Sequence, residues 1–265
     1  MRASDPTPQR RLPLTVLAVA LAVMLVSLVA AWRPWGTVSS VEASEEGAAG
    51  AATALAPLTI PDSPTVLIFG DSWVYGSAAE VPTLGFAYVV ADALGWQATV
   101  DGVRGSGYLK AGIDGPDYGT RIADLDPALD PDLIIVEGSI NDRRLYPDGY
   151  RDAVTTAWET LASTYPEASV VVLGPAPQVL PVEEATAAID ADLADLAAMR
   201  GWWYVSPIAE GWIQPANYFD VIDTGVGNDH PSTAGHAYLA ERLAASLATL
   251  STLPEVSAEA PLGGW

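Results

Sequence analysis

Residues 65–72 read TVLIFGDS, a short apolar run that is rich in β-branched side chains and ends in Gly-Asp-Ser. Four similar runs follow along the chain, at residues 98–100, 132–136, 169–173 and 203–205. Strands that are apolar throughout and separated by helices are typical of a parallel sheet covered on both faces. The sequence therefore predicts a three-layer α/β/α sandwich around a five-stranded parallel sheet.

The longer segments between these strands predict helices, because apolar residues recur in them at helical spacing. The expected helices span residues 86–94, 150–165, 182–199 and 233–250. Ser232 precedes the last of them and is well placed to cap its N-terminus.

Composition divides the chain into five parts. Residues 1–13 form a basic segment, residues 14–32 form an uninterrupted apolar run, and residues 33–61 form a linker of Ala, Gly, Ser and Glu that we expect to be flexible. The α/β domain is predicted over residues 62–250, and a disordered tail over residues 251–265.

The apolar run at residues 14–32 predicts the location of the domain. It is long enough to cross a hydrocarbon core of about 30 Å as a helix. Arg2, Arg10 and Arg11 precede it, which favours an N-terminus held in the cytoplasm and a domain outside it. The alternative is a secreted protein, released by cleavage of a signal peptide at the small residues 29–31. The length of the run favours the membrane anchor.

Composition also excludes several classes of function. The formal net charge is −21 with only 12 Lys and Arg, which argues against nucleic acid and anionic membrane surfaces as partners of the folded domain. The chain has no cysteine, so disulfides, cysteine-ligated zinc and thiol nucleophiles are excluded. The only two histidines are His230 and His236, so a histidine base must be one of them.

Polar residues gather where the predicted strands end. They lie in the segments Gly70-Asp71-Ser72-Trp73, residues 101–107 (DGVRGSG) and residues 137–142 (EGSIND). A fourth polar segment, residues 228–232 (NDHPS), precedes the last helix. Ligands of parallel α/β sheets bind beyond the carboxyl ends of the strands, so we expect all four segments to meet at one edge.

These residue types suit acyl transfer through a serine. A serine hydroxyl becomes a good nucleophile when a base takes its proton, and histidine is the usual base near neutral pH. The oxyanion that forms needs hydrogen-bond donors, which a glycine N–H and an asparagine amide can supply. The nucleophile elbow of other serine hydrolases, Gly-x-Ser-x-Gly, does not occur in the sequence.

In this order and spacing the four segments resemble the GDSL, or SGNH, hydrolase family. Ser72 in GDSW matches the nucleophile, whose own N–H joins the oxyanion hole, and His230 in DHPSTAGH matches the base. Gly105 in VRGSG and Asn141 in GSIND match the other two oxyanion donors. The resemblance covers roughly residues 65–250. It implies a flavodoxin-like α/β/α fold and catalysis without a metal or organic cofactor.

One position departs from the family pattern. Members usually carry an Asp three residues before the histidine, which orients the imidazole, but Gly227 stands there. Asp229 is the nearest substitute, and Asp220 and Asp223 lie further back. Neighbouring side chains of an extended segment point to opposite sides, so Asp229 reaches the ring only if the loop turns sharply. A Ser–His dyad supported by a backbone carbonyl is the alternative.

Other residues compete for these roles. Gly107 is the rival of Gly105 as an oxyanion donor, and His236, inside the last predicted helix, is the rival of His230. An acid-rich stretch at residues 124–132 lacks the glycine turn and bidentate Glu of a common calcium loop, so we interpret its Asp residues as caps and expect no metal.

Four basic residues belong to the second and third strand-end segments: Arg104, Lys110, Arg143 and Arg144. One interpretation is a cleft that favours an anionic or highly polar ester. The other is local pairing with the excess of acidic residues. Trp73 and Arg143 are predicted to line the substrate site.

The expected function is hydrolysis of carboxylic esters outside the cytoplasm, through an acyl-serine intermediate. One alternative is acyl transfer or deacetylation of cell-envelope glycans by the same residues. Another is a catalytically silent binding domain on a tether. The expected partners are a small-molecule or glycan acyl ester, and the membrane through the N-terminal helix.

Overall fold

A computed structural model describes residues 55–252. The predicted basic segment, the membrane anchor, most of the linker and nearly all of the C-terminal tail lie outside the described residues. Within the described range, no helix has the length and apolar character needed to cross a membrane.

A five-stranded parallel sheet forms the centre of the domain. Its strands are β1 (Thr65–Gly70), β2 (Gln97–Gly102), β3 (Leu133–Glu137), β4 (Ser169–Leu173) and β5 (Trp203–Val205), in the order β2-β1-β3-β4-β5. In β1, Ile68 pairs with Val100 of β2 on one side and with Ile135 of β3 on the other. The predicted parallel sheet is confirmed, with strand bounds within two residues of those expected.

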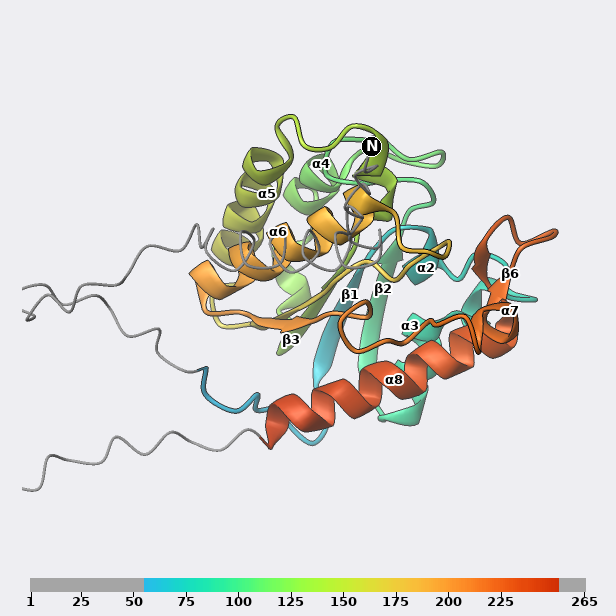
Figure 1. Cartoon of the computed structure of the whole chain (residues 1–265). Coiled ribbons are helices and arrows are strands. Elements are labelled where there is room, and N and C mark those ends of the chain that lie inside the picture. Colours follow the sequence, from blue (N-terminus) through green and yellow to red (C-terminus); the bar gives the residue numbers. More distant parts are fainter. Residues whose placement is uncertain (1–54, 253–265) are drawn as a thin grey trace, which may run out of the picture. The chain divides into compact units, whose positions relative to one another are not determined.

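Helices cover both faces of this sheet (Figure 1). On one face lie α3 (Phe86–Ala93) and α8 (Thr233–Ser251), and on the other lie α4 (Tyr118–Ala123), α5 (Tyr150–Thr164) and α6 (Glu184–Arg200). Successive strand residues point to opposite faces, so each strand serves two cores. Ile68 is buried with the first pair of helices, whereas the adjacent Leu67 is buried with the second group.

Several short elements, most of them at the carboxyl edge of the sheet, were not predicted. They are α2 (Ser72–Tyr75), α7 (Tyr218–Val221), the antiparallel strands β6 (Ile222–Asp223) and β7 (His230–Pro231), and the 3₁₀ turns η1 (Pro82–Leu84), η2 (Pro127–Leu129) and η3 (Ile140–Arg144). The short helix α4 was also missed. Elements of two to six residues are too short to show an apolar period, so the sequence pattern does not reveal them.

The end of the predicted linker belongs to the domain. Leu58 is buried in the core beneath α8, and its N–H donates a hydrogen bond of 3.0 Å to the carbonyl of Leu250. The indole Nε1 of Trp203 donates to the carbonyl of Ala56 at 3.1 Å. The packed domain therefore starts before residue 62, the predicted boundary, because the apolar Leu58 finds a core position.

Candidate active site

The first strand delivers Ser72 to the carboxyl edge of the sheet. β1 ends at Gly70, where an added Cβ would lie 2.5 Å from both Glu137 Oε2 and Val74 Cγ2, so these packed side chains favour glycine. Asp71 then caps α2 by accepting a hydrogen bond from the N–H of Trp73 at 2.9 Å. Ser72 is the first residue of this one-turn helix, and its side chain faces the loop that carries His230.

Ser72 and His230 form a hydrogen-bonded pair. His230 Nε2 lies 2.9 Å from Ser72 Oγ, although 158 positions separate the two residues. The other ring nitrogen, Nδ1, lies 2.9 Å from the carbonyl oxygen of Gly227 and 3.0 Å from that of Asn228. Carbonyl oxygens only accept hydrogen bonds, so we assign the proton to Nδ1. Nε2 is then free to accept the Ser72 proton, as a general base requires.

The loop before His230 explains this support. Asn228 and Asp229 both adopt left-handed backbone conformations, with φ angles of 50° and 62°. The chain therefore turns sharply, but the turn brings the backbone carbonyls to the ring. No hydrogen bond joins Asp229 to the imidazole; its N–H donates to the carbonyl of Asp223 at 2.9 Å. Asp229 is thus not placed as a triad acid, and the geometry is that of the alternative, a dyad supported by backbone carbonyls.

Gly227 also has a steric reason to replace the family's aspartate. A Cβ at this position would lie 2.6 Å from the Cβ of Asp223 and 2.8 Å from the Cβ of Ala78. Cβ atoms do not approach this closely, so any larger residue would displace the loop. The departure from the family pattern is therefore built into the packing of this loop.

The structure brings the two expected oxyanion donors to the same cleft as the dyad. Gly105 and Asn141 line it together with Ser72 and His230. Among the described residues, the N–H groups of Ser72 and Gly105 have no hydrogen-bond acceptor. The Asn141 amide Nδ2 lies 2.8 Å from Asp71 Oδ2 and 3.0 Å from the carbonyl of Ser106. These contacts hold the amide at the cleft, and because they use both of its hydrogens, one contact must be released when the amide donates to an oxyanion.

Gly107, the rival of Gly105, has a different role. Its N–H already donates to the carbonyl of Lys110 at 2.8 Å. An added Cβ there would overlap the buried carboxylate of Asp142, which accepts hydrogen bonds from the N–H groups of Tyr108 at 2.8 Å and Leu109 at 3.0 Å. Gly107 therefore lets two strand-end loops approach each other, and Gly105 is left as the available donor.

His236, the rival base, is a buried structural residue. Its Nδ1 accepts from the N–H of Phe86 at 3.2 Å, its Nε2 donates to the carbonyl of Ser77 at 2.9 Å, and its side chain is inaccessible to solvent. Burial lowers its pKa to about 4. It does not line the cleft.

Burial of His236 predicts a pH-dependent stability. Between pH 6.5 and pH 4 the unfolded chain binds a proton at this ring that the folded chain excludes, so stability is lost as the pH falls through this window. The loss attributable to His236 is at most about 3 kcal/mol. Urea unfolding at pH 7 and pH 5 should show a steeper fall for the native chain than for His236→Gln. An equal fall in both proteins would contradict this assignment.

Behind the dyad lies a buried polar network that the sequence analysis missed. The N–H of Asp71 donates to Glu137 Oε2 at 3.2 Å, and both carboxyl groups are fully buried. Burial, and then the neighbouring Asp71, raise the pKa of Glu137 well above its usual range. Two adjacent buried carboxylates cannot both ionise easily, so we assign the shared proton to Glu137 and the charge to Asp71.

Arg121 completes this network. Its guanidinium donates to the carbonyl of Gly70 and to Ser106 Oγ, each at 2.9 Å, and pairs with Asp101 Oδ1 at 2.8 Å. One cation thus joins the ends of β1 and β2 to the Gly105 loop. The sequence does contain a signal for this network. Glu137 directly follows an apolar predicted strand, and a charged residue that is buried at the end of such a segment needs a partner such as Arg121.

The cleft above the dyad is large enough for a substrate. It measures about 410 Å³, within the range of about 300–1,000 Å³ typical of ligand sites. Arg143, predicted to line the substrate site, does line this cleft.

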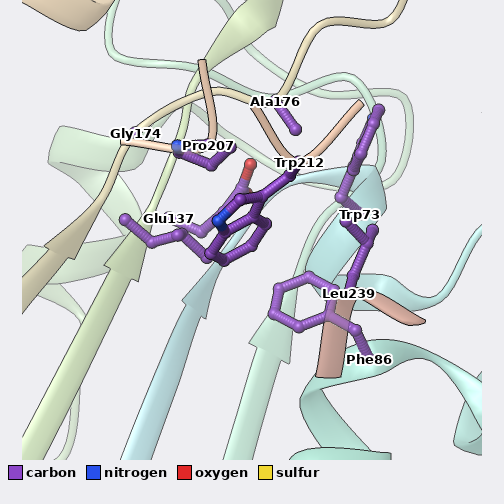
Figure 2. Close-up of a pocket in the computed structure, with 9 residues that line it drawn as sticks. Trp73, Phe86, Glu137, Gly174, Ala176, Pro207, Trp212 and Leu239 are labelled. Carbon is purple, nitrogen blue, oxygen red and sulfur yellow. The ribbon is translucent and has the colours of Figure 1, made fainter. Parts of the chain in front are cut away.

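Trp73, the other predicted lining residue, lies elsewhere. Figure 2 shows it in an apolar cavity with Phe86, Trp212 and Leu239, and Glu137 lines the same cavity. The free volume there is about 10 Å³, which holds one water molecule at most. Trp73 is only 3% exposed, so it packs in the core rather than against substrate.

The acid-rich stretch at residues 124–132 is used for caps and strand ends. Asp126 caps η2 by accepting from the N–H of Ala128, and Asp132 accepts from both the N–H and the hydroxyl of Thr65. In the described part of the chain, no three His, Asp or Glu residues are grouped so that they could hold a metal.

Comparison with known proteins assigns the chain to a family of ester hydrolases. Residues 68–238 match the GDSL-like lipase/acylhydrolase family. The GDSL lipase Rv0518 of Mycobacterium tuberculosis is 30% identical over 148 residues, which cover 54% of this chain and 62% of that protein. The match thus spans less than two thirds of that curated relative.

Solved structures share the fold. A two-domain esterase (CEX) active on acetylated mannans has a TM-score of 0.56 and 18% identity, covering 77% of this chain and 53% of that one. An aryl esterase of M. smegmatis has a TM-score of 0.51 and 18% identity, covering 70% and 99%. The family match extends over more than half of the chain and confirms the family that the sequence motifs predicted. The protein therefore belongs to the GDSL-like lipase/acylhydrolase family, a family of hydrolases that act on ester bonds.

Proposed function

We propose that the domain hydrolyses carboxylic esters through an acyl-serine intermediate. The observation that carries the proposal is the 2.9 Å hydrogen bond between Ser72 Oγ and His230 Nε2 at the base of an open cleft. Gly105 and Asn141 stand beside it, so nucleophile, base and oxyanion donors meet at one edge of the sheet.

The reaction begins when His230 Nε2 takes the Ser72 proton and Oγ attacks the ester carbonyl carbon. The resulting oxyanion is held by the N–H groups of Ser72 and Gly105 and by the amide of Asn141. The protonated imidazole then gives its proton to the leaving alcohol, and the C–O bond breaks to leave the acyl-serine. Water, activated by the same ring, releases the acid.

The carbonyls of Gly227 and Asn228 support the imidazolium in this cycle. Their dipoles face Nδ1 at 2.9 and 3.0 Å, so they stabilise the positive charge and fix the plane of the ring. A carboxylate would stabilise the imidazolium more strongly. The dyad therefore relies on orientation more than on a countercharge.

A fluorophosphonate probe tests the proposal against a catalytically silent binding domain. The folded chain should be labelled at Ser72, and Ser72→Ala should not be labelled although it remains folded. Absence of labelling in the folded native chain would overturn the hydrolase proposal. Adding a sugar acceptor to the ester assay separates hydrolysis from acyl transfer, because a transferase forms a new ester in place of the free acid.

We also propose that the domain acts outside the cytoplasm, on a membrane anchor at residues 14–32. Arg2, Arg10 and Arg11 in front of that run support this orientation. The full chain should stay with the membranes after alkaline extraction and should be digested when protease is added outside intact cells. Recovery of a shortened chain from the medium would indicate a cleaved signal peptide instead.

A further inference from the structure

The cleft carries a charge opposite to that of the protein. The whole chain has 33 acidic residues against 12 basic ones. Four of those basic residues, Arg104, Lys110, Arg143 and Arg144, nevertheless line this one cleft, and no Asp or Glu is among the residues that line it. A cleft lined by charges of one sign concentrates its field on the ligand that enters.

Ion pairs with nearby carboxylates neutralise only two of these four cations. Arg104 pairs with Asp114, with 2.6 Å between Nε and Oδ2, and Arg143 pairs with Glu183, with 2.8 Å between Nε and Oε2. Within residues 55–252, Lys110 and Arg144 form no ion pair, and both are exposed at the cleft. The carboxylate of Asp142 lies beneath this region, but it is buried and held by two backbone N–H groups.

The position of the cations within the cleft is also informative. They belong to the loops after β2 and β3, which carry the oxyanion donors Gly105 and Asn141. Three other residues that line the cleft, Ser77, Gly227 and Asn228, lie close in sequence to Ser72 or His230, and none of them is charged. The leaving alcohol must lie near His230 Nε2 to receive its proton, so we expect the loops that carry the cations to contact the remainder of the substrate.

We propose that the substrate is an anionic ester, whose negatively charged group contacts Lys110 and Arg144 while its carbonyl lies at Ser72. This inference rests on the proposed ester hydrolysis and adds the substrate class. Because the cations belong to the loops of the oxyanion donors and not to the loop of His230, we place the charge on the acyl part, as in the half-ester of a dicarboxylic acid.

Matched esters test the charge and its place. One pair shares an alcohol and compares a succinyl with a butyryl group, and a second pair shares an acetyl group and compares an anionic with a neutral alcohol. In low salt, kcat/KM for the succinyl ester should exceed that for the butyryl ester by about tenfold or more. This ratio should fall towards one as added salt screens the charges.

Variants of the cleft locate the effect. Lys110→Gln and Arg144→Gln should each lower the ratio several-fold. Arg200→Gln is the matched control, because Arg200 ends α6 just before β5 begins, at the opposite edge of the sheet, and it should leave the ratio unchanged. A preference in the second pair alone would support the anionic ester and move the charge to the alcohol. Equal rates within both pairs would overturn the inference yet leave ester hydrolysis intact, whereas no hydrolysis of any ester and no probe labelling would overturn both.

Discussion

Replacing Ser72 with Ala is expected to lower kcat for ester hydrolysis by about 10⁶-fold, the size of the loss when the nucleophile of a well-studied serine protease is removed. The reason is geometric, since Ser72 Oγ is the hydroxyl that lies 2.9 Å from the base. Initial rates with a chromogenic ester, after active-site titration of the native chain, measure the effect.

His230→Ala should cost about as much as Ser72→Ala, and the double variant should be no worse than either single one, because the two residues act as a unit. Nearly additive losses would mean that Ser72 has another base. The buried His236 is the only other histidine, and its pKa of about 4 makes it a poor base near neutral pH.

Asp229→Ala is the control that distinguishes a dyad from a triad. Loss of a triad acid costs about 3 × 10⁴ in kcat in that protease. Because the ring of His230 is held by the carbonyls of Gly227 and Asn228, we expect kcat of Asp229→Ala within about threefold of the native value. A loss of several orders of magnitude would show that Asp229 does orient the imidazole during catalysis.

The sequence was sufficient to predict the sheet and its long helices. In the strand at residues 169–173, the last four residues are buried, and all four are apolar because both faces of the sheet are covered. The long helices α5 and α8 extend over four or more turns, enough for their spacing to be recognised. The short elements α2, β6 and β7, which place Ser72 and His230, leave no such period.

The site could be predicted in its residue types but not in its supports. Ser72 and His230 were recognised from their motifs, whereas the support for the imidazole is a backbone feature. The left-handed conformations of Asn228 and Asp229 bring the carbonyls of Gly227 and Asn228 to the ring. A sequence pattern of side chains does not reveal such a backbone turn. Likewise, the shared proton of Glu137 and Asp71 depends on their burial side by side, which follows from strand register.

Asn141→Ala is expected to lower kcat by about 10²–10³-fold with little change in KM, because an oxyanion donor acts on charge that exists only in the transition state. In the structure the amide Nδ2 of Asn141 donates hydrogen bonds to Asp71 Oδ2 at 2.8 Å and to the carbonyl of Ser106 at 3.0 Å. Its loss should therefore also lower the free energy of unfolding, by about 1–3 kcal/mol, because buried acceptors lose their donor.

Ser139→Ala separates these two effects of Asn141. Ser139 Oγ donates to the same carbonyl of Ser106 at 3.0 Å, in the same loop, but Ser139 does not line the cleft. Both variants should unfold at lower urea concentrations, and only Asn141→Ala should lose kcat by two orders of magnitude or more. If both lose kcat equally, Asn141 acts by positioning the loop, and the oxyanion is held by the N–H groups of Ser72 and Gly105 alone.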